Sequence, residues 1–120
     1  MSFESILKEV VLGVDGATGA IFLDNGGEAV QWYCKVESDR LRLRAAYLAV
    51  VVQTCRSSCA RLNLGAVSQT VLEYEGARLI LEEIDASYFI VLELSSSANL
   101  AKAMTRLSTA TMSLRREIAA

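Results

Sequence analysis

Three cysteines are the residues with the most recognisable chemistry. Cys55 and Cys59 lie one helical turn apart, a spacing that presents two thiols on one face of a helix. A structural zinc site normally takes four cysteine or histidine ligands, but only Cys34 remains and the chain has no histidine. We therefore interpret Cys55 and Cys59 as small apolar core residues and expect no metal, no redox role and no other cofactor.

Six carboxylates on the later part of the chain are the candidates for general acid–base catalysis. They are Glu73, Glu75, Glu82, Glu83, Asp85 and Glu93. The absence of histidine removes the pairings that activate a serine or cysteine nucleophile, and no cofactor motif accompanies the acids. We interpret them as solvated charges at strand edges, which discourage aggregation, and predict that the protein is not an enzyme.

A glycine-rich segment at residues 13–19 raises the question of a phosphate-binding loop. The segment has no Lys-Ser/Thr pair, and its glycines follow a helix and precede a strand, which is the reverse of the nucleotide-binding order. Tight turns explain these glycines better than a bound phosphate.

Composition bounds the remaining possibilities. The 120 residues are enough for one small domain, expected to span 1–120. A hydrophobic content of 52% excludes disorder, and a net charge of −2 disfavours a nucleic-acid binder. The longest apolar run is Ala45–Val52, too short to insert into a membrane. With no secretory segment and an odd number of cysteines, we expect reduced thiols and a cytoplasmic protein.

Hydrophobic periodicity predicts three helices and five strands. The helices are expected at 2–14, 38–62 and 99–120, and the strands at 16–23, 28–33, 67–74, 77–84 and 88–94. The predicted helix stops are Gly13 and Gly65, the second in a left-handed conformation. The last two strands carry apolar residues on both faces, so both faces must be covered. We predict an α+β domain of three layers, helix–sheet–helix, with an antiparallel sheet and the order αββαβββα.

The long helix is unusual because its middle, 45–52, is apolar all the way round. Its main stripe consists of Leu41, Leu48, Val51, Val52, Cys55, Cys59 and Leu62. A surface helix would carry charge on one side of these turns. We therefore expect this helix to be covered on one side by its own sheet and on the other by a second molecule.

Basic residues surround the same helix. They are Lys35, Arg40, Arg42, Arg44, Arg56 and Arg61. They have two interpretations: a solvated helix start, or the rim of an interaction surface that includes Tyr47, since Arg and Tyr are enriched at binding hot spots.

Several local patterns resemble the roadblock/dynein light chain family, in particular its MglB-like members. The segments 13–17 (GVDGA), 19–24 (GAIFLD) and 25–27 (NGG) are similar to the family's opening pattern. The segments 46–49, 82–84, 88–92 and 100–103 fit as well, so the resemblance covers nearly the whole chain. It departs from the family in having no proline and a slightly different glycine spacing.

This resemblance implies a roadblock/profilin-like fold and a dimer. The long helix would cover one face of a five-stranded sheet, and the first and last helices the other. The strand at 67–75 would lie at the sheet edge and pair with its copy in a homodimer, or with a heterodimer partner, giving a ten-stranded sheet. The expected dimer interface comprises Leu41, Leu48, Val51, Val52, Cys55, Gln69, Val71 and Glu73.

The resemblance also implies a function, because family members bind small Ras-like GTPases as activators or scaffolds and have no chemistry of their own. Arg40, Arg44 and Tyr47 are our own choice for the rim of the GTPase-binding surface, since the family pattern does not mark them. Two alternatives stay open. One is a small-ligand sensor with a pocket lined by the cysteines and Trp32; the other is a purely structural dimerisation scaffold.

Overall fold

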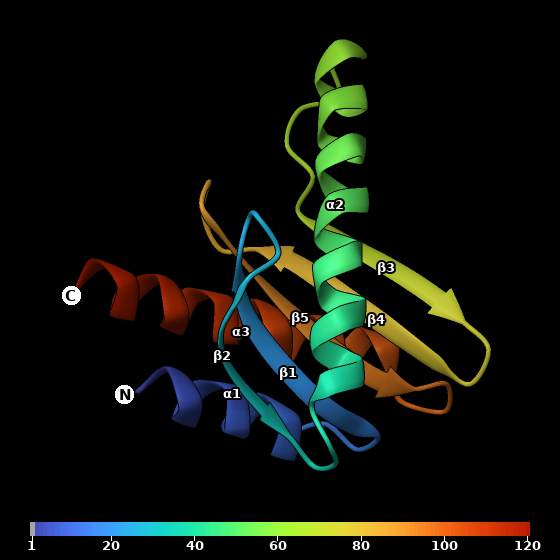
Figure 1. Ribbon diagram of the computed structural model, residues 1–120, viewed down its shortest axis with the longest axis vertical. Coiled ribbons are helices and arrows are strands. Elements are labelled where there is room, and N and C mark those ends of the chain that lie inside the picture. Colours follow the sequence, from blue (N-terminus) through green and yellow to red (C-terminus); the bar gives the residue numbers. More distant parts are fainter. Residues whose placement is uncertain (1) are drawn as a thin grey trace.

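Five strands form one antiparallel sheet in the spatial order β2-β1-β5-β4-β3 (Figure 1). The computed structural model describes residues 2–120. The strands are β1 (Ala17–Asp24), β2 (Ala29–Cys34), β3 (Gln69–Tyr74), β4 (Ala77–Glu83) and β5 (Tyr88–Ser95). Helix α2 (Asp39–Arg61) crosses one face, while α1 (Phe3–Leu12) and α3 (Leu100–Ala119) cover the other. The predicted fold class and element order are confirmed.

Alternating side chains on the central strands divide the core into two layers. On β4, Ile80 packs with α1 and α3, whereas Leu79 and Leu81 pack with α2. On β5, Ile90 belongs to the first layer and Val91 to the second. These residues are at most 2% exposed. A sheet that is apolar on both faces requires a helical layer on each.

Side chains cap the N-termini of α1 and α3, whereas Ser38 at the start of α2 makes no side-chain capping hydrogen bond. The Ser2 hydroxyl accepts the Ser5 N–H at 3.1 Å, and the Asn99 carboxamide oxygen accepts the Lys102 N–H at 3.0 Å. The prediction that Gly65 provides the left-handed cap of α2 is wrong. Gly65 does have the expected positive φ, 84°, but the residue that closes the end of α2 is Asn63, with φ 58°.

Asn63 can close the helix because the backbone N–H of Leu64 then reaches back to the carbonyl oxygen of Cys59 at 3.0 Å. This contact is the signature of a Schellman motif. Ending the helix here lengthens the connection to the next strand, and β3 begins at Gln69 rather than at residue 67.

The long apolar stripe expected on α2 does not stay buried along its length. The residues of α2 that are buried against the sheet are Leu41, Ala45, Leu48, Ala49 and Val52. By contrast Val51, Cys55 and Leu62 are exposed. The C-terminal turns of α2 extend past the sheet in Figure 1, beyond the reach of the five strands. The interpretation of Cys55 as a core residue is therefore wrong, and Cys59 is only half-buried.

Close approach between α2 and β1 depends on Gly19. A Cβ atom at this position would lie 2.7 Å from Leu41 Cδ2 and 2.9 Å from Cys34 Sγ. Leu41 is only 3% exposed and has little room to move. Glycine at residue 19 thus lets the helix sit directly on the strand.

We predict that Gly19→Ala lowers the free energy of unfolding by about 1–3 kcal/mol, because the added methyl overpacks the contact with Leu41. Urea denaturation monitored by circular dichroism measures this change. Gly26→Ala is the matched control, since its Cβ would meet only Asp24 Oδ1 at 3.3 Å. Equal destabilisation by the two variants would contradict the explanation.

Candidate interaction surface

An apolar groove runs between α2 and the edge strand β3. It has a volume of about 340 Å³. Leu43, Tyr47 and Val51 line it from the helix, and Leu72 and Tyr74 line it from the strand. The groove offers almost no polar atoms, so it suits an apolar surface of another molecule better than a polar metabolite.

The outer face of α2 continues this apolar surface. Leu43, Tyr47, Val50 and Val51 are 60%, 69%, 61% and 52% exposed. They lie on the side of the helix opposite the residues packed on the sheet. Single exposed apolar residues are common on protein surfaces, but four large ones on successive turns of one helix form a contiguous patch, which is typical of an interaction site.

Strand β3 is an open edge of the sheet. Among the strands of residues 2–120 it pairs only with β4. Leu72 lies opposite Leu79 and faces α2, while Val71 lies opposite Ile80 and faces the α1 and α3 layer. Val71 is 39% exposed and Leu72 45%. An exposed, partly apolar edge of this kind is a template for another strand.

The five α2 residues predicted for the dimer interface divide into two groups. Leu41, Leu48 and Val52 are at most 3% exposed and pack in the core beneath α2, so they have no surface to offer a second copy. The prediction is wrong for these three, because it placed the same apolar stripe of α2 both against the sheet and in the interface, and the sheet already covers these side chains. Val51 and Cys55 are exposed, as the prediction requires.

The two polar residues predicted on β3 also behave differently. Gln69 points inward: its Nε2 donates to Glu82 Oε1 at 2.8 Å and to the Met104 carbonyl oxygen at 3.2 Å. Glu73 is 64% exposed and lies 3.6 Å from Arg78 Nε. Of the pair, Glu73 is the one that lies at the surface of the edge strand.

Arg44 belongs to a structural network rather than to a free rim. Its guanidinium lies 3.1 Å from Glu93 Oε2 and 5.3 Å from the centre of the Tyr74 ring. The Tyr74 hydroxyl is 3.3 Å from the same carboxylate oxygen, and the Thr18 hydroxyl donates to Glu93 Oε1 at 2.6 Å. The network ties α2 to strands β1, β3 and β5.

This network changes the acidity of its neighbours. Burial, together with the negative charge of Glu93, raises the pKa of the Tyr74 hydroxyl. Burial and the charges of Glu93 and Glu37 raise the pKa of the Cys34 thiol. A thiol that holds its proton is a poor nucleophile, so Cys34 is chemically quiet near neutral pH.

Several of the six acids are not the solvated edge charges that were expected. Glu82 is 8% exposed, and the side chain of Glu93 is 14% exposed and ion-paired with Arg44. Glu83 pairs with Arg56 at 2.6 Å. The packing of α2 on the sheet brings Arg44 next to Glu93 and Arg56 next to Glu83. Hydrophobic periodicity in the sequence does not predict these ion pairs.

The other two residues chosen for the partner-binding rim lie at the surface. Arg40 and Tyr47 are exposed on α2, as the partner-binding prediction requires. Both side chains are therefore accessible to a partner.

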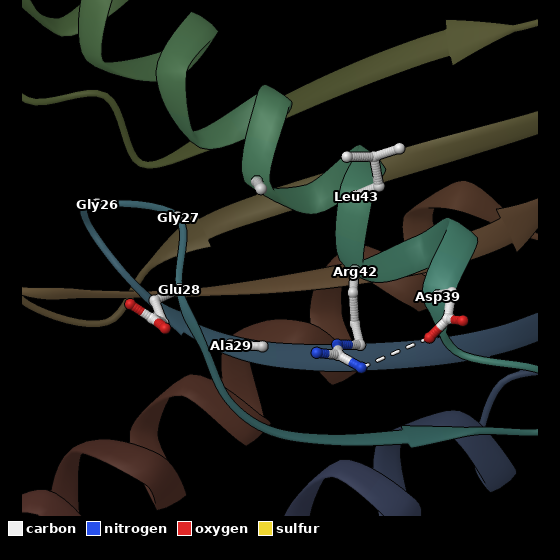
Figure 2. Close-up of a pocket in the computed structure, with 8 residues that line it drawn as sticks. Gly26, Gly27, Glu28, Ala29, Asp39, Arg42 and Leu43 are labelled. Atoms are coloured by element: carbon white, nitrogen blue, oxygen red, sulfur yellow. Dashed lines mark ion pairs between the residues drawn. The ribbon is translucent and has the colours of Figure 1, made fainter.

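A second depression lies on the other side of α2, against the β1–β2 turn. It has a volume of about 470 Å³. Figure 2 shows Arg42 reaching from α2 toward Ala29, while Leu43 points the other way. Arg42 pairs with Asp39 at 3.6 Å and stacks 4.4 Å from the Trp32 ring centre. These contacts satisfy the arginine within the chain.

The cysteines do not converge on a sensor pocket. Cys34 lines a small cavity of about 60 Å³ beside Arg40, whereas Cys55 and Cys59 lie toward the C-terminal end of α2 and do not line this cavity. The predicted pocket lined by these cysteines and Trp32 is therefore wrong. Within residues 2–120, no three acidic, cysteine or histidine side chains gather at a spacing suited to a metal ion. None of the helices described here has the length and hydropathy of a membrane span.

Solved structures identify the architecture. A roadblock/LC7 domain from Streptomyces avermitilis superposes with a TM-score of 0.89 at 19% identity, over 98% of each chain. The chain has the roadblock fold. The gliding protein MglB from Thermus thermophilus has a TM-score of 0.83 at 20% identity, over 93% of this chain and 84% of MglB.

A more distant likeness is to profilin II of Acanthamoeba castellanii, with a TM-score of 0.64 at 11% identity, over 97% of this chain and 98% of profilin. No family model and no curated protein matches the sequence. At these identities the likeness establishes the roadblock fold and its similarity in architecture to profilin, and no activity.

We predict that Arg44→Glu lowers the stability of the roadblock fold by about 1–3 kcal/mol, because Glu93 would lose its partner and face a second carboxylate. Thermal or urea unfolding measures the loss. The exposed Arg40→Glu serves as the control and should change stability by about 0.5 kcal/mol or less. If Arg44→Glu is as well tolerated as Arg40→Glu, Arg44 is a free surface residue after all.

Proposed function

We propose that this chain is a non-enzymatic homodimeric interaction module that binds a small Ras-like GTPase and regulates or scaffolds it. One observation carries the dimer: the open edge of β3 and the apolar outer side of α2 adjoin each other across a single groove. A second copy that pairs with β3 covers the open edge and the groove beside it with one contact, and leaves the outermost side of α2 exposed. The structural likeness to MglB supports the same interpretation.

The symmetry of such a dimer follows from the strand geometry. A two-fold axis perpendicular to the sheet pairs β3 antiparallel with its copy and keeps both α2 helices on one side. Val71 then lies on the same face as its counterpart, and Leu72 likewise. The two grooves merge, so that Val51 and Leu72 of one copy meet apolar side chains of the other.

This arrangement leaves α1 and α3 of both copies on the opposite side of a ten-stranded sheet. The joint α2 face becomes a broad platform, with Tyr47 and Arg40 exposed on it. We place the GTPase on this platform, on the strength of the resemblance to MglB-like domains. Arg44 is withdrawn from the proposed rim, since Glu93 and Tyr74 already occupy its guanidinium.

We predict that the protein dissociates when Val51 becomes arginine. A charged side chain in the groove opposes apolar packing between copies, yet Val51 is already 52% exposed, so the monomer fold tolerates the change. Light scattering coupled to gel filtration should give twice the 13.0 kDa chain mass for the native protein and the chain mass for Val51→Arg.

Leu12→Arg is the matched control, because Leu12 is 57% exposed at the end of α1, away from the groove. This variant should stay dimeric. A native protein that elutes only as a 13.0 kDa species would refute the proposed dimer.

We predict that the dimer recovers a Ras-like GTPase from lysate of its source organism, identified by mass spectrometry after loading with GDP or a non-hydrolysable GTP analogue. Tyr47→Glu, once light scattering shows that the variant is still dimeric, should reduce recovery by about tenfold or more, because Tyr47 is a large, exposed side chain where the groove borders the platform. Leu12→Glu should leave recovery unchanged. A stable dimer that binds no such GTPase in either nucleotide state would favour the structural scaffold.

A further inference from the structure

A cavity on the face of the sheet opposite α2 has no role in the proposed dimer platform. It lies between the end of β4, helix α3 and the segment 66–68 that leads into β3. Its volume is about 560 Å³, within the range of small-molecule sites. The groove described above lies on the α2 side, so the two are separate.

One wall of this cavity contains a buried carboxylate that is only half satisfied. Glu82 is 8% exposed. Its Oε1 accepts hydrogen bonds from Gln69 Nε2 and Ser108 Oγ, both at 2.8 Å. Its Oε2 is closed off from solvent and has no hydrogen-bond partner among residues 2–120. A buried carboxylate oxygen without a partner costs free energy, which a donor would recover.

A second unsatisfied group lines the same cavity. Thr111 is 3% exposed, and its Oγ1 is also closed off from solvent and without a partner in the described part of the chain. It follows Ser108 by three residues on α3, so both hydroxyls lie on the helix face that meets β4. An anionic acceptor and a hydroxyl therefore lie just beneath the wall of the cavity, both without a hydrogen-bond partner in the described part of the chain.

Other lining residues supply apolar contact. Val67 and Met112 line its mouth, and Met112 is 52% exposed. Arg115 also lines it, but its Nε donates to the Ile84 carbonyl oxygen at 2.8 Å, so this donor is directed at the backbone. Since both free oxygens are closed off, a ligand reaches them once neighbouring side chains shift, and methionine is well suited to such adjustment.

We propose that this cavity binds a small primary amine that carries an apolar body. The ammonium group donates hydrogen bonds to Glu82 Oε2 and to Thr111 Oγ1, while the apolar part packs against Val67 and Met112. Three carboxylates, those of Glu82, Glu83 and Asp85, line the cavity against the one guanidinium of Arg115, so a cationic ligand is favoured over a carboxylate. A purely apolar ligand would leave both oxygens unpaired. Hydrogen bonds to a charged group are the stronger kind, so the ammonium is the main determinant of affinity.

This site is independent of the proposed function. It uses residues of β4, α3 and the segment 66–68, on the side of the sheet opposite α2, and binding is measured on the free protein without any GTPase. A result that contradicts the dimer or GTPase binding does not contradict the amine site, and a result that contradicts the amine site does not contradict the dimer or GTPase binding.

The test compares 2-phenylethylamine with 2-phenylethanol, which has the same shape but no charge at neutral pH. Titration of the native protein by two-dimensional NMR should give saturable shifts for the amine, centred on 66–68, 82–85 and 108–112. The alcohol should bind more weakly by about tenfold or more. No saturable shift with the amine, or equal binding of both compounds, overturns the proposal.

Two nearly isosteric variants separate the site from general effects. Glu82→Gln and Thr111→Val should each weaken amine binding, the first by about tenfold or more because it removes the charge. Thr109→Val is the control: it is the same threonine-to-valine substitution on the exposed side of α3, and it should leave amine binding unchanged. If Glu82→Gln folds, as its NMR spectrum shows, and binds the amine as well as the native protein does, the assignment is wrong.

Discussion

The sheet carries apolar side chains on both faces, and covering both faces is the constraint on which the rest of the structure depends. Ile80 and Ile90 need one helical layer, and Leu79 and Val91 need another. Two helices cover the first face and one covers the second. A single helix is narrower than five strands, so the α2 layer leaves β3 partly uncovered and creates the apolar groove at that edge.

Helix α2 consequently serves two surfaces at once. The side with Leu48 and Val52 completes the core, whereas the side with Tyr47 and Val51 faces outward. This division explains why the middle of the helix is apolar all the way round. It also explains how a substitution at Val51 can act on association without removing a core contact, because the two sides have separate neighbours.

Polar groups inside the layers have two different roles. Glu93 is satisfied by Arg44, Tyr74 and Thr18, which fixes the position of α2 over three strands. Glu82, on the other side of the sheet, keeps one oxygen without a partner among the described residues. The first carboxylate is a structural tie between layers. Glu82 is the basis for proposing a binding site in the adjoining cavity, because a carboxylate with all its hydrogen bonds made would have no need of a ligand.

The sequence by itself determined the layered architecture, because period-two and period-3.6 patterns, capping residues and turn glycines are local signals. Those signals also placed β3 as a strand and showed that α2 has more apolar surface than one sheet can cover. Only the tertiary structure decided which of these side chains are buried: Leu41 and Leu48 pack against the sheet, whereas Cys55 is exposed. The sequence also could not predict the partners of Arg44 and Glu82, because each contact joins residues that are distant in the sequence and depends on how the helical layers pack on the sheet.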